Sequence, residues 1–207
     1  MLALRHPALL VAVVAATAAA AACGGGSAQQ SPLTRIAPVM DLGAQSTIGL
    51  VTFTAEGARG GLVRLATERF QEQMLAAQPG IRILELGTVS GPVDAAAARR
   101  LGEQHHVKSI VVGHLQVSDL KPRVRLIGGL RASTEVTLAL STKLLSTETG
   151  ATVWARSSSV RETMHEVAIV NGTAVFDAQD AADAYGEIVS ALIERVTTDF
   201  RPTWVRP

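Results

Sequence analysis

The stretch TLALSTKLLSTETGATVWA, from Thr137 to Ala155, decides the fold of this chain. Apolar and polar residues alternate from Val136 to Leu144, which is the pattern of a strand with one buried side. The polar turn over 146–150 then reverses the chain, and a second β-rich run follows it. We therefore expect a long antiparallel hairpin in the second half of the sequence.

The residues before this hairpin alternate between strand and helix patterns. Three β-rich runs are separated by two helical segments: strands at 47–53, 81–86 and 109–115, and helices at 62–75 and after Asp94. Pro79-Gly80 ends the first helix, and the Asp94 carboxylate is expected to cap the second. This order is a βαβαβ start. The basic run from Lys121 to Arg125 is expected to be a solvated loop, and contact with lipid headgroups or an acidic partner is the alternative.

Two further elements follow the long hairpin. Asn171-Gly172 predicts a second, short hairpin. An apolar stripe from Ala181 to Phe200 predicts a C-terminal helix that Asp177 caps and Pro202 ends. The fold class is therefore α/β with a mixed (α+β) sheet, as a single two-layer or three-layer domain.

The first 22 residues are typical of an export signal. Arg5 precedes an apolar run from Ala8 to Ala22, which is shorter than the roughly 20 residues of a membrane-spanning helix. Cys23 is the only cysteine of the chain. Exported proteins normally pair their cysteines, and this one has no partner within the chain.

Ala20-Ala21-Ala22-Cys23 resembles the lipobox of bacterial lipoproteins. The resemblance implies cleavage before Cys23 and acyl chains such as palmitate on its sulfur and amino group, which would anchor the protein to membrane lipid. Gly24, in place of Asp, implies the periplasmic face of the outer membrane. That family usually has Leu where this chain has Ala20, so a secreted protein with a free thiol stays open as the alternative.

The mature chain divides in two. Residues 23–46 are rich in Gly, Ser, Gln and Pro without an apolar period, and we expect a flexible tether there. Residues 47–207 are enough for one periplasmic α/β domain with a core.

The element order of that domain resembles the TolB N-terminal-like, LpoB-like, PelC-like and CsgG-like domains of bacterial envelope proteins. Five segments carry the resemblance: 48–53, 62–75, 81–86, 95–113 and 137–155. It implies a non-catalytic module that binds or assembles envelope proteins, in export or in peptidoglycan synthesis. A subunit of an oligomeric ring in a polysaccharide or fibre secretion machine is the alternative, so a homo-oligomer stays open.

The charges and the histidine spacing argue against two other functions, nucleic-acid binding and metal binding. The chain has 19 Lys and Arg against 18 Asp and Glu, so it lacks the positive field that nucleic-acid binding uses. His105-His106 would need His114 or His165 to form a metal site, but adjacent histidines point to different sides. We expect His105-His106 to be a solvated helix end, and His114 to be a hydrogen-bonded interior residue.

Motifs for catalysis are also missing. Gly57, Gly60 and Gly61 follow a strand without the spacing of a phosphate-binding loop, and no GxSxG elbow presents a serine nucleophile. We predict no catalytic residue, no metal and no cofactor, and a lipid-anchored hydrolase is the last alternative.

Because aromatic residues make up only 3% of the chain, Trp154 and Trp204 are the candidate partner contacts. Trp204 lies in a tail without expected secondary structure.

Overall fold

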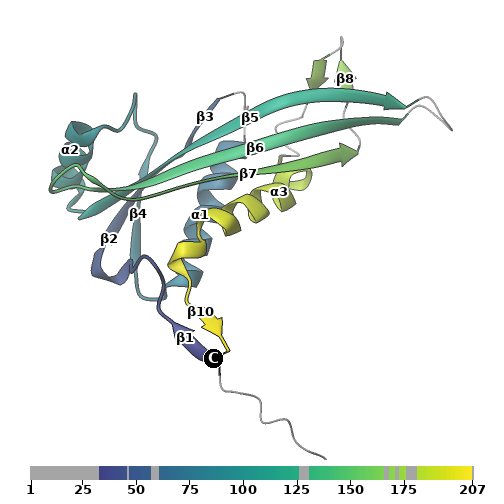
Figure 1. Ribbon diagram of the computed structural model, residues 1–207. Coiled ribbons are helices and arrows are strands. Elements are labelled where there is room, and N and C mark those ends of the chain that lie inside the picture. The colour runs from purple at the N-terminus through teal and green to yellow at the C-terminus, as the bar shows by residue number, and fades with distance from the viewer. Residues whose placement is uncertain are drawn as a thin grey trace, which may run out of the picture.

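The computed structural model describes residues 33–206 except 46, 57–60, 126–130, 166–167, 171–172 and 176–180. Within these ranges it confirms the expected class, with helices packed on a mixed sheet (Figure 1). The strands are β1 (Thr34–Ile36), β2 (Thr47–Val51), β3 (Thr54–Glu56), β4 (Arg82–Gly87), β5 (Ser109–Arg125), β6 (Arg131–Ser146), β7 (Thr152–His165), β8 (Ala168–Val170), β9 (Thr173–Val175) and β10 (Thr203–Val205). The helices are α1 (Leu62–Ala77), α2 (Ala95–His105) and α3 (Ala181–Val196), with short 3-10 helices at Gly43–Gln45 and Thr198–Phe200.

The main sheet has the strand order β4-β2-β5-β6-β7. β2 lies parallel to both β4 and β5, whereas β5, β6 and β7 are antiparallel neighbours. Parallel neighbours need a crossover, and α1 and α2 supply it in the first half. The long hairpin expected from Thr137 to Ala155 is the β6–β7 pair.

The two faces of the sheet are covered unequally. α1 and α3 pack on one face, where the alternation in β6 buries Leu138, Leu140 and Leu144 against residues such as Phe70. α2 covers the opposite face at one end, over a smaller cluster around Ile110. Figure 1 shows α2 at one end of the long strands, away from α1 and α3. Beyond α2, the described part of this second face of β5, β6 and β7 is open.

The ends of α2 follow from its sequence. The Asp94 carboxylate accepts a hydrogen bond from the Ala97 backbone N–H at 2.8 Å, so the expected N-cap is confirmed. At the other end His106 takes a left-handed conformation, with φ 54°, and its N–H bonds to the Gly102 carbonyl. The chain can then turn directly into β5.

The folded part begins earlier than the predicted residue 47. β1 pairs antiparallel with β10, and the Leu42 side chain is completely buried in the core. The sequence also predicted no secondary structure around Trp204, which lies in β10. Each strand is three residues long and its partner is at the other end of the chain, so neither has a local signal.

Three other boundaries differ from expectation. The strand expected over 47–53 ends at Val51, and a separate strand, β3, follows it. Lys121 to Arg125 belongs to β5 and pairs with β6, where a loop was expected. The final helix ends at Val196, followed by a 3-10 turn to Phe200. β8 and β9 form the short second hairpin, while Asn171-Gly172 and Asp177 lie outside the described residues.

Candidate functional site

The open face of the sheet carries small side chains. On β6 and β7 it consists of Thr137, Ala139, Ser141, Lys143, Ala155, Ser157, Ser159 and Arg161, which are exposed or half-buried. Since most of these side chains are short, little side-chain bulk covers the backbone of the two strands. Antiparallel sheets tolerate such a solvated face because the other face supplies the core.

One polar row crosses this face over four strands. The strand register places Thr54 of β3 beside His114 of β5, His114 opposite Ser141 of β6, and Ser141 opposite Ser157 of β7. The Thr54 Oγ1 lies 3.0 Å from the His114 Nδ1, and the Ser141 and Ser157 hydroxyls lie 2.8 Å apart. The row therefore consists of two hydrogen-bonded pairs side by side.

His114 is hydrogen-bonded as expected, but the prediction that it is interior is wrong. Its side chain is exposed on the open face. It does alternate with Ile110 and Val112, and those two residues pack in the cluster under α2. The alternation predicted the correct face of the strand. His114 is exposed because α2 covers Ile110 and Val112 on this face but does not extend over His114.

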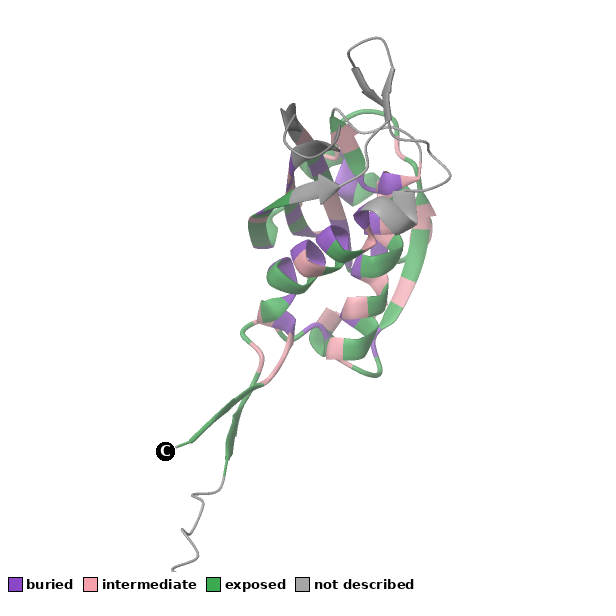
Figure 2. Cartoon of the chain, turned by 90° about the vertical axis from the view of Figure 1, so that its right-hand side faces the viewer, coloured by how far each residue is buried: buried purple, intermediate pink, exposed green. Residues whose placement is uncertain are grey.

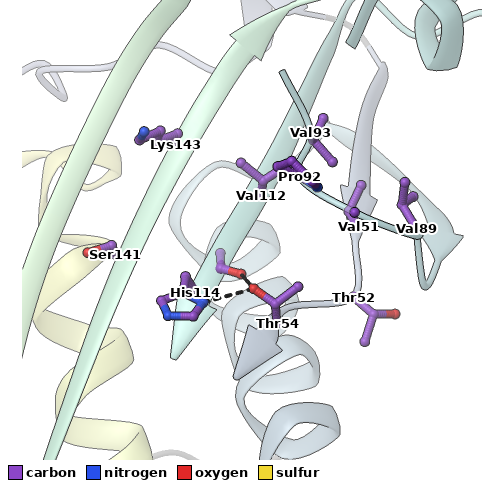
Figure 3. A pocket seen from close by; sticks show the side chains of 12 residues that line it. Val51, Thr52, Thr54, Val89, Pro92, Val93, Val112, His114, Ser141 and Lys143 are labelled. Carbon is purple, nitrogen blue, oxygen red and sulfur yellow. Dashed lines mark hydrogen bonds between the residues drawn. The ribbon is translucent and has the colours of Figure 1, made fainter. Parts of the chain in front are cut away.

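A pocket of about 250 Å³ lies at the edge of the open face, where the loop between β4 and α2 approaches the sheet. Figure 3 shows Val112 of β5 close to Pro92 and Val93 of this loop, with Ser141 and Lys143 on the β6 side. The pocket thus combines an apolar wall with an ammonium group and a hydroxyl at its rim. A group with an apolar body and a polar or anionic end fits this arrangement.

The other histidines do not converge on this pocket. His105 is the last residue of α2, and His106 follows it. Among the residues that the structure describes, no group of three His, Cys, Asp or Glu side chains is placed to hold a metal ion. Gly61 precedes α1 in a helical conformation, while Gly57 and Gly60 lie outside the described residues.

Trp154 lies in the core. Its side chain is 8% exposed, and its ring centroid is 4.6 Å from that of Phe200. The indole Nε1–H donates to the Asp199 carboxylate at 3.1 Å, and Arg156 contacts the same carboxylate at 3.3 Å. The side chain is thus occupied by internal contacts, and we retain only Trp204 as a candidate partner contact.

Trp204 lies on the β1–β10 ribbon, by which we mean residues 34–36 and 203–205. All six side chains are exposed, and Trp204 itself is 58% exposed. Figures 1 and 2 show the ribbon projecting from the rest of the molecule. Cys23, the predicted lipidation site, lies outside the described residues, ten positions before Leu33 in the sequence.

Gln78 fixes the base of this ribbon. Its side-chain Nε2 donates to the Met40 carbonyl at 2.6 Å and to the Phe200 carbonyl at 3.0 Å, and its Oε1 accepts from the Leu42 N–H at 2.7 Å. The Met40 N–H also donates to the Asp199 carbonyl. One carboxamide therefore ties the segment after β1, the segment before β10 and the end of α1 together.

No family model and no curated protein matches the sequence. Solved structures are similar to it at low identity. A PelC dodecamer from Paraburkholderia phytofirmans is 13% identical, over 83% of this chain and 97% of that chain, with a TM-score of 0.41. Lipoprotein GNA1162 from Neisseria meningitidis is 13% identical, over 73% and 97%, with a TM-score of 0.41. The LpoB C-terminal domain from Salmonella enterica is 11% identical, over 57% and 84%, with a TM-score of 0.38. PelC and LpoB give their names to two of the groups that the element order resembles.

Sequence reasoning missed Gln78 and the polar row. Gln78 follows the last turn of α1 and precedes Pro79, so the sequence marks it only as a helix end. Its three backbone partners lie 36 to 122 positions away. The polar row depends in the same way on the register of four strands.

Within the described residues, no helix is both long and apolar enough to span a bilayer.

Proposed function

We propose that this protein is a lipid-anchored lipoprotein of the bacterial envelope whose α/β domain binds other envelope proteins without catalysing a reaction. In this proposal residues 1–22 are the cleaved signal peptide and Cys23 carries the acyl chains. The domain then stands on the periplasmic face of the outer membrane. Several acyl chains are enough for stable anchoring, because each buried methylene contributes about 0.8 kcal/mol.

The observation that carries the proposal is the open face of the sheet. Its short side chains over β6 and β7 allow the backbone of a partner to approach closely, and its hydroxyl row supplies donors and acceptors. Lys143 and Arg161 are the two charged residues in this set. A protein surface with carboxylates and hydrogen-bonding groups complements this combination.

The hydrogen bonds of the polar row favour binding over hydrolysis. A serine nucleophile needs a base within hydrogen-bond reach. Ser141 instead bonds to Ser157, and the His114 ring bonds to Thr54. In the described row the His114 ring therefore bonds to Thr54 and not to a serine hydroxyl.

Photo-crosslinking in intact cells tests this binding surface. A photoreactive amino acid is placed at Ser157 on the open face and, as the control, at Arg64 on α1, whose side chain is 76% exposed. We expect Ser157 to capture a defined envelope protein, identified by mass spectrometry, that Arg64 does not capture. Identical products at both positions would contradict the proposal.

The anchor is tested separately by the Cys23→Ser variant. The proposal expects the wild-type protein to fractionate with the outer membrane, with an intact mass that includes acyl chains. The variant is expected in the soluble periplasmic fraction. A variant that stays membrane-bound, or a wild-type N-terminus without acyl chains, would remove the lipid anchor from the proposal.

A second candidate is a subunit of a ring, and the edge of β7 favours it. β7 is the last strand in the described order of the main sheet, and β4 is the first. The Ser159 carbonyl points away from β6 and already accepts one hydrogen bond, from Arg195 at 3.1 Å. Pairing of β7 with β4 of a second copy is a head-to-tail contact, which closes into a ring when the rotation permits. Native mass spectrometry in detergent separates a ring from a monomer.

A further inference from the structure

We propose that the β1–β10 ribbon lies in the lipid headgroup layer of the membrane that carries the Cys23 anchor. This inference rests on the acylation of Cys23 in the proposed function. It adds a second membrane contact, made by the folded domain itself.

Exposed apolar side chains are concentrated at the ribbon. Among the described residues, eight large apolar side chains are exposed: Leu33, Ile36, Val39, Leu75, Leu84, Val153, Trp204 and Val205. Three of the eight belong to the ribbon, Leu33 directly precedes it, and Val39 lies three positions after Ile36. Single exposed apolar residues are normal on protein surfaces, whereas a local concentration indicates a contact surface.

The ribbon has no core of its own. All six of its side chains are exposed, and an isolated two-stranded ribbon is marginally stable in water. The base is held by Gln78, but the strands themselves extend away from the body (Figure 2). The register places Ile36 and Val205 on the face opposite to Trp204, so a layer that surrounds both faces would stabilise the paired strands.

The chemistry of the ribbon fits a lipid surface. Arg35 and Trp204 are opposite each other in the register, so their side chains share one face. Tryptophan is enriched at the membrane interface, where the ring is buried and the indole N–H stays hydrated. The arginine stem lies along apolar surface while its guanidinium reaches the phosphates.

The ribbon and its flanking residues carry three arginines: Arg35, Arg201 and Arg206. Asp41 and Asp199 are the acidic residues nearest to the ribbon in the sequence, and Arg201 pairs with Glu194 at 3.1 Å, so Arg35 and Arg206 are the cations that a lipid surface would meet. Near a membrane with anionic lipid, each such cation contributes about 1 kcal/mol of attraction. A protein partner of the ribbon would have to supply this negative charge itself.

The sequence brings the ribbon close to the anchor. The chain from Cys23 to Leu33 spans at most about 35 Å when fully extended, which is near the thickness of one bilayer. An acylated Cys23 therefore confines the ribbon to the neighbourhood of the lipid surface. Membrane lipid is the first surface available to its exposed side chains.

Tryptophan quenching by brominated lipids tests the inference. The acylated full-length mature protein is reconstituted in phospholipid vesicles with bromine near the top of the acyl chains. Trp154 and Trp204 are the only two tryptophans, and Trp154 is buried. Quenching of Trp204 alone should therefore remove roughly half of the emission, since tryptophan at the interface lies at headgroup level. Trp204→Phe should retain an unquenched signal from Trp154.

Two matched variants separate the ribbon from the anchor. Val205→Asp on the ribbon should lower the quenching severalfold, and Val153→Asp, at a similarly exposed valine of β7, should leave it unchanged. Equal quenching in the wild type and in Trp204→Phe would overturn the inference. A loss of Trp204 quenching that grows with protein concentration would also overturn it, because a second copy and not the lipid would then cover the ribbon. Acylation is read independently from the intact mass, so a missing anchor is distinguished from a ribbon that stays in water.

Discussion

His106 shows how one residue joins two elements. It ends α2 with φ 54°, a conformation that costs a side chain about 1 kcal/mol and that glycine adopts freely. His106→Gly should therefore raise the free energy of unfolding by about 0.5–1 kcal/mol in urea denaturation. His105→Gly is the control, because it places glycine at the last residue of α2, which keeps a helical conformation, and should lower stability by up to about 1 kcal/mol. Changes of the same sign in both variants would contradict this account.

Tyr185 makes stability depend on alkaline pH. Burial disfavours its phenolate and raises the pKa of Tyr185 to about 12. Because the folded pKa lies above the ordinary value of 10, the stabilisation is complete below about pH 10. It is lost as the pH rises from 10 through about 12, by up to about 2–3 kcal/mol.

This alkaline transition is accessible to experiment, since Tyr185 is the only tyrosine. Its ionisation is followed by ultraviolet absorbance, and urea denaturation is compared at pH 8 and pH 11. Tyr185→Phe should lose less stability over the same interval than the wild type. An equal loss in both proteins would assign the alkaline effect to other groups.

At the scale of elements, the Gln78 side chain holds the ribbon to α1. Gln78→Glu keeps the shape but replaces an N–H₂ that donates to two carbonyls by a carboxylate that cannot donate. We expect a loss of about 2 kcal/mol in the free energy of unfolding, since two part-buried carbonyls lose their partner and face a carboxylate. Amide hydrogen exchange should quicken at Met40 and Leu42 first. Gln116→Glu, on the open face, should change stability by less than about 0.5 kcal/mol.

The elements that sequence analysis predicted correctly are those with a local period. The β6–β7 hairpin shows a two-residue alternation, and α1 shows apolar residues at helical spacing, so each pattern identifies its own element. β1 and β10 were missed because a three-residue strand exists only through its distant partner. Lys121 to Arg125 reads as a loop from composition, yet pairing with β6 continues β5 through it.

The candidate site was less predictable than the fold. Alternation placed His114 and Ser141 on the correct faces of their strands, but their neighbourhood depends on how β5 and β6 align. That register follows from the whole hairpin and not from either segment. Exposure of His114 depends further on where α2 ends above the sheet, which sequence alone does not fix.

At the scale of the whole molecule, the edge of β7 is the contact surface in the proposed ring. Lysine on an edge strand opposes strand pairing because its charge must stay hydrated. If the protein assembles through this edge, Ser157→Lys with Ser159→Lys should reduce the native mass in detergent to that of a monomer. Ser190→Lys, on the exposed side of α3, should leave the mass unchanged. A ring that persists in the double variant would place the contact elsewhere.

The hydrogen bonds at the base of the ribbon also determine which contacts bear a mechanical force on the N-terminal end of the domain. If Cys23 carries the proposed acyl chains, a force on the bilayer pulls the domain at its N-terminal end and is transmitted along β1 toward β2. It first meets Met40 and Leu42, where the Gln78 carboxamide and the buried Leu42 side chain resist it. In the proposed lipid-anchored protein these contacts would bear the force before it reaches the central strands, and the register of the sheet would be preserved.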